Sequence, residues 1–276
     1  MYKRVLTIQD ISCVGQCSLT VALPIISACG IETAVLPSAV LSTHTAGFKG
    51  FTFRDLSCDM QGICEHWEKE KITFDGVYTG YLGSIEQIDT VKDIVKRTLK
   101  KDAPFIVDPA MADNGKLYPA FDIEYANKMK ELCALSDFII PNITEACYLT
   151  GVEYREEYDE KYIKELTDKL LNLGAKCVVL TGVTYKKGKT GVLVTTGEHT
   201  SYYEHEKLSN SCHGTGDIYA SAFVGALIRG KTAEQSAKIA ADYTVSSIEE
   251  TAKIDNHWYG ACFELALPKL ISMINE

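Results

Sequence analysis

The sequence predicts an α/β protein with a mostly parallel central sheet that is covered by helices on both faces. Short runs rich in β-branched residues alternate along the 276 residues with longer segments of helical periodicity, which is the pattern of repeated strand–helix–strand units. After Thr181 the pattern changes, because apolar and polar residues alternate there around turn-forming glycines. An antiparallel hairpin is therefore expected at one edge of the sheet.

Composition favours one domain and a small ligand. The hydrophobic content of 46% supplies a sizeable core, and no repeat or low-complexity linker divides the chain, so we expect a single domain over residues 1–276. The formal net charge is −9 and no basic run is present, which argues against nucleic acid or an anionic membrane as the partner. A small molecule is the expected partner.

The ten cysteines are expected to be reduced thiols of a cytoplasmic protein, because the N-terminal segment has no signal-peptide pattern. No C-x-x-C pair occurs, and Cys13 and Cys17 have no third ligand after them, so neither a structural zinc nor an iron–sulfur site is expected. The longest apolar stretch, residues 21–31, is too short to span a bilayer.

The predicted elements follow one another in regular order. Strands are expected at six short apolar runs, namely 4–8, 32–37, 75–80, 104–108, 137–141 and 177–182. Helices are expected between and after them, at 18–29, 84–100, 123–135, 161–173 and 233–250. This alternation would bring the carboxyl ends of the parallel strands to one edge, where open α/β sheets bind their ligands.

The most informative stretch runs from Ser209 to Gly230. Its polar HGTG segment leads into a helix that is apolar on almost every side, so this helix is buried and its N-terminus is fixed. Two glycines let the backbone approach a ligand and leave the amides of Gly214, Thr215 and Gly216 free for an anion. Asp217 lies in the first turn, where the helix dipole lowers its proton affinity and should keep it ionised at neutral pH.

Anion-binding amides beside an ionised carboxylate are what phosphoryl transfer requires. The amides neutralise the migrating phosphoryl group, while the carboxylate orients the attacking hydroxyl and accepts its proton. Taken alone, the pattern also fits an aspartate that only caps a core helix.

Three other motifs are considered and disfavoured. GVTYKKGKT resembles a P-loop, but five residues separate Gly182 from Gly188 and a strand is expected to follow. GTGDIY has Tyr219 where a dinucleotide-binding fingerprint needs its third glycine. Cys212 and His213 could be a nucleophile and its base, but neighbours in sequence rarely form such a pair and no orienting partner is recognisable.

The glycine-rich string resembles the GxGD signature of the ribokinase-like superfamily of small-molecule kinases. Five further strings look like those of the pyridoxal and pyridoxamine kinases within it, and the resemblance covers essentially the whole chain. They are THTAGF (43–48), TGYLGS (79–84), DPAMADNGKLY (108–118), PNITEACYLTG (141–151) and VVLTG (178–182). The fold that this implies is a ribokinase-like three-layer sandwich.

The resemblance implies a role for each matching residue. Asp217 would be the catalytic base, and the stretch from Met111 to Tyr118 would be a mobile cover over ATP. Asp10 would contact the acceptor, at a position where the family commonly has serine. Singly, several of these residues could be turn residues or caps, and Thr144 in particular could cap the helix that follows. The remaining implied residues are Asp113, Tyr118, Asn142 and Thr181 for the nucleotide, Asp108 and Glu145 for the metal, and Thr45 and Tyr81 for the acceptor.

The expected function is ATP-dependent phosphorylation of the hydroxymethyl group of pyridoxal, pyridoxamine or pyridoxine. The resemblance implies Mg²⁺ with ATP as co-substrate, and a monovalent cation such as K⁺ as a further candidate. It also implies a homodimer. Two alternatives stay open: a hydroxymethylpyrimidine kinase of the same superfamily, and a non-catalytic ligand-binding protein with this fold.

Overall fold

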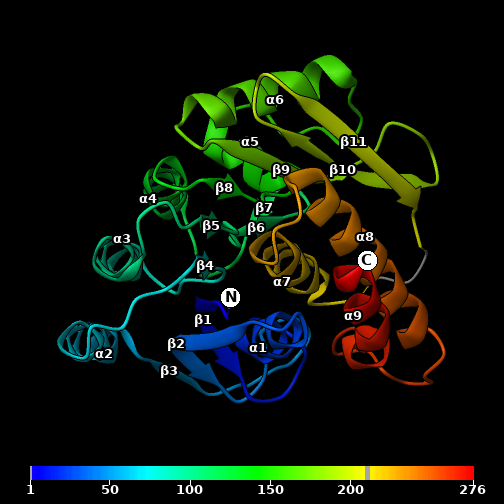
Figure 1. The fold of residues 1–276 in the computed structure, drawn as a ribbon. Coiled ribbons are helices and arrows are strands. Elements are labelled where there is room, and N and C mark those ends of the chain that lie inside the picture. Colours follow the sequence, from blue (N-terminus) through cyan, green and yellow to red (C-terminus); the bar gives the residue numbers. More distant parts are fainter. Residues whose placement is uncertain (1, 209–211) are drawn as a thin grey trace.

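The computed structural model describes residues 2–208 and 212–276, so the first three residues of the Ser209–Gly230 stretch lie outside it. One nine-stranded sheet runs through the described chain in the order β11-β10-β9-β8-β5-β4-β1-β2-β3 (Figure 1). Its strands are β1 (Arg4–Ser12), β2 (Glu32–Leu41), β3 (Phe53–Asp55), β4 (Val77–Thr79), β5 (Phe105–Val107), β8 (Phe138–Ile139), β9 (Cys177–Val183), β10 (Lys189–Thr195) and β11 (Thr200–Glu206).

The centre of the sheet is parallel and both edges are antiparallel. Strands β2, β1, β4, β5, β8 and β9 pair in parallel, whereas β10 runs antiparallel to β9 and to β11. The predicted edge hairpin is therefore confirmed. At the other edge β3 pairs antiparallel with β2, which the sequence patterns did not indicate.

Helices cover both faces of the sheet and make it a three-layer structure (Figure 1). One face carries α2 (Ser57–Lys69), α3 (Ile85–Thr98), α4 (Ile123–Ala134), α5 (Ile143–Thr150) and α6 (Glu160–Asn172). The other carries α1 (Leu19–Ala28), α7 (Thr215–Ile228), α8 (Ala233–Thr251), the short 3-10 helix η1 (Phe263–Ala266) and α9 (Leu267–Asn275). Each face has its own cluster of buried apolar side chains, as the sequence pattern predicts for a sheet buried on both sides.

Helix starts follow simple capping chemistry. Ser84, Asp122 and Asp159 accept hydrogen bonds from the first-turn amides of α3, α4 and α6. The cap of α5 is Asn142 within a reciprocal capping box with Glu145. The suggestion that Thr144 caps this helix is wrong, because Thr144 already lies inside its first turn.

The segment 111–118 is a tight hairpin rather than an irregular loop. It contains β6 (Ala112–Asp113) and β7 (Lys116–Leu117), which form a separate two-stranded sheet. Asn114 and Gly115 both have positive φ, so the reversal fits a two-residue turn.

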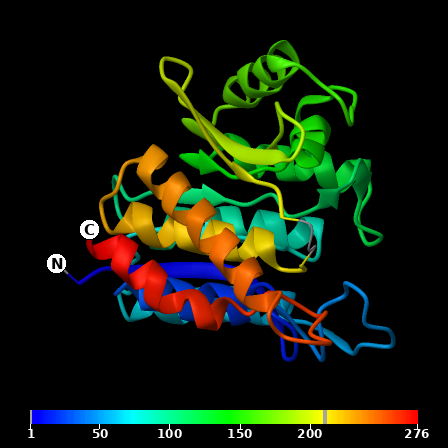
Figure 2. The same ribbon diagram turned by 90° about the vertical axis from the view of Figure 1, so that its right-hand side faces the viewer.

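The loops that follow the parallel strands lie together at one end of the molecule. Figure 2 shows this end opposite the end at which β1 begins and α9 finishes. The predicted site residues lie in the last residues of these strands, in the loops and hairpin that follow them, or in the first turns of α5 and α7, so the fold brings them to one edge of the sheet. Within the described ranges, no helix is both long and apolar enough to cross a membrane.

Candidate active site

Asp217 lies in the first turn of α7 at the carboxyl edge of the sheet. Its Oδ2 accepts a hydrogen bond of 3.0 Å from the backbone amide of Ser18, in the loop between β1 and α1. Ser18 has φ 56° and ψ −131°, a positive-φ backbone conformation that is uncommon for a residue with a side chain. This contact joins residues 199 positions apart and fixes the orientation of Asp217.

Burial raises the pKa of Asp217 to about 6, the charge of Asp10 adds to the increase, and the Ser18 amide opposes it. The net shift is therefore opposite to the lowered proton affinity that the helix position alone predicts, because burial dominates. The carboxyl group is still mostly ionised at pH 7. A carboxylate with a pKa this close to neutrality is well matched to proton transfer.

The N-terminus of α7 leaves its first-turn amides available. Gly214 is the N-cap with φ 76°, and no side-chain hydrogen bond caps the described helix start. A Cβ on Gly214 would lie 1.9 Å from the Gln16 carbonyl oxygen, so only glycine fits there. Gly216 is exposed, and a Cβ on it would meet nothing within 4 Å. Open space beside the amides of Thr215 and Gly216 suits an incoming anion.

Two further carboxylates are buried at the ends of neighbouring elements. Asp108 follows β5 and is 8% exposed, and Glu145 in α5 is 3% exposed. Burial raises both pKa values, that of Glu145 to about 8, and the charges of Glu145 and Asp217 raise the pKa of Asp108 further. Asp10, Asp108, Glu145 and Asp217 together form what we term the carboxylate set.

Glu145 ties the hairpin to the start of α5. Its Oε1 accepts a 3.1 Å bond from the Met111 amide, and its Oε2 accepts a 2.8 Å bond from the Asn142 amide. Asn142 in turn donates from Nδ2 to the Ala112 carbonyl at 2.9 Å. Each Glu145 oxygen thus accepts one backbone hydrogen bond and keeps a second lone pair, so capping of α5 does not exclude ligand binding.

The hairpin tip and its tyrosine lie beside these carboxylates. The Gly115 amide donates to Thr144 Oγ1 at 3.0 Å, which holds the tip against α5. Asp113 is exposed and accepts from the Asn114 amide at 2.8 Å, so it stabilises its own turn. Burial, then Glu145 and Asp108, raise the pKa of the half-buried Tyr118, which indicates that its hydroxyl lies near them.

Thr181 lies in the second half of β9 beside Asn142. The two residues form a parallel bridge, and the Thr181 amide and hydroxyl both approach the Pro141 carbonyl, at 2.9 and 3.3 Å. The predicted nucleotide residues Asn142 and Thr181 therefore come together where β8 and β9 lie side by side, whereas the Asp217 side chain is tied to the loop after β1.

Asp10 and Tyr81 lie on the β1–β4 side of Asp217. Asp10 is 4% exposed and accepts from Ser12 Oγ at 3.1 Å. Burial raises the pKa of Asp10, and hydrogen bonds from Ser18 and Ser12 oppose this. Burial and the Asp10 charge together raise the pKa of Tyr81 to about 12. The Tyr81 ring is 5.3 Å from that of Phe121, so an aromatic wall borders this carboxylate.

The predicted residue Thr45 is exposed, and its neighbour His44 is the buried one. His44 Nδ1 accepts from the Ala46 amide at 3.1 Å, so its Nε2 carries the proton and donates to the Tyr259 carbonyl at 2.7 Å. The His44 ring also packs against Phe48 and lies 5.6 Å from His213. Sequence reasoning missed His44 and Ser18, although the THTAGF string contained the former.

Cys212 and His213 lack the features of a nucleophile and base. Burial raises the pKa of Cys212, which favours the thiol over the reactive thiolate, and no hydrogen bond joins the two side chains in the described chain. His213 is exposed. The hydrolase interpretation has no support.

A resident metal site of three or more His, Cys, Asp or Glu ligands does not occur among residues 2–208 and 212–276. Two carboxylates at Asp108 and Glu145 do fit Mg²⁺ that enters with a polyphosphate, because Mg²⁺ usually takes one or two protein carboxylates and fills its other positions with water and phosphate oxygens. Burial raises the pKa values of both carboxyl groups and so favours their protonated forms. A bound cation would favour the charged forms instead.

A three-layer α/β fold with an open helix N-terminus, a carboxylate in its first turn and a hairpin beside buried carboxylates defines a small-molecule kinase. The comparisons then give its family. The family model described as phosphomethylpyrimidine kinase matches residues 26–261, and the chain belongs to this family.

Relatives and solved structures agree with that assignment. The chain is 30% identical to a pyridoxal kinase of Dictyostelium discoideum over 84% of its own length and 80% of that protein. A Bacteroides thetaiotaomicron structure assigned as a phosphomethylpyrimidine kinase superposes with a TM-score of 0.94 at 34% identity. The superposition covers 98% of this chain and 94% of that one. A second crystal form of a Bacteroides thetaiotaomicron phosphomethylpyrimidine kinase contains pyridoxal. The Lactobacillus plantarum pyridoxal kinase superposes with a TM-score of 0.90 at 29% identity, covering 98% and 97%.

Proposed function

We propose that this kinase transfers the γ-phosphoryl group of ATP to the hydroxymethyl group of pyridoxal, pyridoxamine or pyridoxine. The observation that carries the proposal is the placement of Asp217, which the Ser18 amide holds between Asp10 and the nucleotide-side residues. In that position the carboxylate orients the acceptor hydroxyl and takes its proton. The amides of Gly214, Thr215 and Gly216 hold the migrating phosphoryl group.

The nucleotide occupies the β8–β9 end of the site. Asn142 and Thr181 border its phosphates, while Asp113 and Tyr118 on the hairpin cover it. Asp108 and Glu145 hold Mg²⁺, which neutralises the phosphate oxygens when it is bound. The support is that all these side chains lie at one edge of the sheet and that both metal-side carboxylates lack a cationic partner in the described chain.

The acceptor ring lies on the other side of Asp217. Tyr81 gives it a flat aromatic face and Asp10 meets its ring nitrogen, because a carboxylate favours the protonated pyridinium. Thr45 contributes from the exposed rim beside His44. The relatives and the pyridoxal-containing neighbour support this acceptor.

Further properties belong to the same proposal. We infer that the chain forms one domain over residues 1–276, works in the cytoplasm as a homodimer, and can use a monovalent cation such as K⁺ with Mg²⁺. The continuity of the nine-stranded sheet supports the single domain. Native mass spectrometry and the dependence of ADP release on K⁺ test the dimer and the cation.

The second candidate is a hydroxymethylpyrimidine kinase, which the description of the matching family model favours. Both candidates use the same transfer chemistry and differ in the acceptor ring. A coupled assay for ADP release with the three vitamers and hydroxymethylpyrimidine separates them through kcat/KM. Preference for the pyrimidine would overturn the pyridoxal proposal, and no ADP release with any acceptor would leave the non-catalytic ligand-binding alternative.

A further inference from the structure

The loop between β4 and α3, which carries Tyr81, is fixed through one peptide group. The carbonyl of Leu82 and the amide of Gly83 belong to this group, which is planar. Tyr125 Oη in α4 donates to the carbonyl at 2.6 Å, and the amide donates to Gln87 Oε1 in α3 at 2.7 Å. Because the carbonyl and the amide of a trans peptide point in opposite directions, this peptide cannot rotate without losing one of the two bonds.

Both side chains that hold the peptide are polar groups buried in a mostly apolar layer. Gln87 is 0% exposed and Tyr125 is 3% exposed, and they come from helices that pack beside each other on one face of the sheet (Figure 1). Gln87 Nε2 also donates to the Ser38 carbonyl at 3.0 Å and to Ser57 Oγ at 2.9 Å. Buried polar groups destabilise a fold unless they are hydrogen-bonded, and here these bonds tie the Tyr81 loop to α4, β2 and α2.

A second route joins Tyr125 to Tyr81 through an aromatic ring. The ring of Phe121 stacks on that of Tyr125, with centroids 3.8 Å apart and an angle of 9° between the planes, and lies 5.3 Å from the Tyr81 ring. Burial, then Tyr81, raise the pKa of Tyr125 well above the usual value, so its hydroxyl stays protonated and remains a donor. Tyr125 thus supports Tyr81 through the peptide that follows it and through the Phe121 ring.

We propose that Tyr125 is a positioning residue for the acceptor, because it holds Tyr81 in place on the acceptor side of the site. The inference rests on the proposed function, in which the Tyr81 ring faces the acceptor ring. Two stacked rings attract each other only at a favourable offset and tilt, so a shift of Tyr81 weakens acceptor binding. The nucleotide-side residues Asn142 and Thr181 lie on other elements, so the effect should be confined to the acceptor.

Tyr125→Phe tests the hydroxyl alone, since it keeps the ring that stacks on Phe121. The carbonyl of Leu82, a residue that is 0% exposed, would lose its donor, and a buried carbonyl without a partner favours a shift of the loop. The affinity for pyridoxal, measured by calorimetric titration, should fall about 3- to 10-fold. KM for pyridoxal should rise by the same factor, while KM for ATP and kcat should change less than about twofold.

Tyr243→Phe is the matched control. Tyr243 in α8 is also 0% exposed, and its hydroxyl donates to the Phe263 carbonyl at 3.0 Å on the other face of the sheet. Both variants should lower Tm by a similar amount, because each removes one buried hydrogen bond, but Tyr243→Phe should leave KM for pyridoxal unchanged. The double variant Tyr81→Ala/Tyr125→Phe should bind pyridoxal no more weakly than Tyr81→Ala, because Tyr125 acts through Tyr81.

Three results would overturn the inference and leave the proposed function standing. They are an unchanged affinity for pyridoxal in Tyr125→Phe, an equal loss of affinity in Tyr243→Phe, and additive losses in the double variant. Wild-type protein that binds no pyridoxal in the same titration would instead overturn the proposed acceptor, and this inference with it.

Discussion

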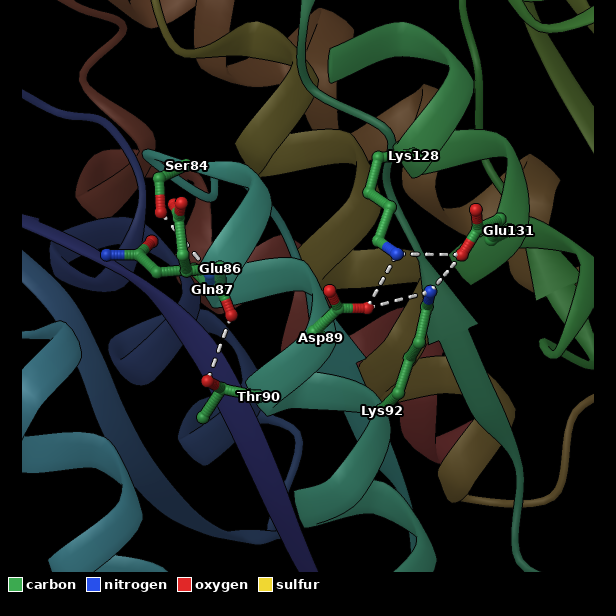
Figure 3. Close-up of polar contacts among 8 residues, drawn as sticks. All are labelled: Ser84, Glu86, Gln87, Asp89, Thr90, Lys92, Lys128 and Glu131. Carbon is green, nitrogen blue, oxygen red and sulfur yellow. Dashed lines mark hydrogen bonds and ion pairs between the residues drawn. The ribbon is translucent and has the colours of Figure 1, made fainter. Parts of the chain in front are cut away.

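Two groups of charged residues in this protein use carboxylates in opposite ways. Figure 3 shows the first, in which Asp89 and Lys92 of α3 meet Lys128 and Glu131 of α4 on the surface. Lys128 lies 2.9 Å from Asp89 and 3.1 Å from Glu131, and hydrogen bonds from the lysines lower the pKa of both acids. Every charge in this cluster has a partner.

The carboxylate set differs from the surface cluster both in its ion pairs and in the direction of its pKa shifts. Within the described chain, no ion pair includes Asp10, Asp108, Glu145 or Asp217, and burial raises all four pKa values. Burying like charges together without a cation destabilises the fold. The paired surface cluster has the features of a structural contact. Unpaired carboxylates with raised pKa values, of which Asp217 is half-buried and the other three are buried, are instead typical of ligand-binding sites.

The largest effect is expected from removing the proposed base. Asp217→Asn should leave folding intact and lower kcat by about 10²–10⁴, the usual range for loss of a general base. Asp89→Asn is the matched change in the surface cluster and should leave kcat unchanged. Kinetics on both variants measure the contrast, and near-normal turnover by Asp217→Asn would remove the proposed role.

The second largest effect is expected from replacing Asp10, the carboxylate on the proposed acceptor side. A hydrogen bond to a charged group contributes about 1.5–3 kcal/mol, so Asp10→Asn should raise KM for pyridoxal roughly 10- to 150-fold and change kcat less. If Asp10 serves only its local contact with Ser12 Oγ, the variant should instead melt at a lower temperature with KM unchanged. Kinetics and a melting curve together distinguish the two outcomes.

A smaller effect should appear in the pH dependence. Because the pKa of Asp217 is raised to about 6, kcat/KM should fall as the pH drops through that value, since the protonated acid cannot accept the hydroxyl proton. The charge of Asp10 contributes to this increase, so Asp10→Asn should move the acid limb to lower pH. An acid limb that stays in place in this variant would show that the two carboxylates are not coupled. Repeating the profile with a second vitamer controls for titration of the substrate.

The smallest effect is expected in the surface cluster. Lys128→Met should lower Tm by less than about 2 °C, because exposed ion pairs contribute little, and added salt should reduce the difference further. Turnover should not change. A large loss of stability, measured by a thermal melt, would mean that this cluster matters more than its exposure indicates.

Most of the fold could be predicted because its signals are local. The apolar runs of β1 and α7 and the alternation after Thr181 each identify an element without knowledge of its neighbours. Helix α2 was missed because its only buried residues are Met60 and Cys64, so its periodicity is weak, and Gly62 interrupts it. Strand β3 was missed because all three of its residues are exposed.

The positions of the candidate site residues could be predicted where these residues are contiguous in the sequence. GTGD and PNITE each carry several groups within a few positions, whereas the contact of Ser18 with Asp217 spans 199 positions and has no local signal. His44 was overlooked in favour of Thr45 because burial depends on Tyr259, which lies far along the chain. The pKa direction of Asp217 was wrong because burial outweighs the helix dipole, and burial cannot be read from neighbouring residues.

The order in which the site residues occur along the chain has a consequence for biosynthesis. The residues of the proposed nucleotide side lie between positions 108 and 181, Asp217 follows later, and the carbonyl of Tyr259 that accepts from His44 is made later still. A chain still attached to the ribosome would therefore contain the residues of the proposed nucleotide side before it has the anion-binding amides at the start of α7, the proposed base or the acceptor rim. Phosphoryl transfer then has to wait until the last helices have emerged, so a partly made chain would not hydrolyse ATP through this carboxylate.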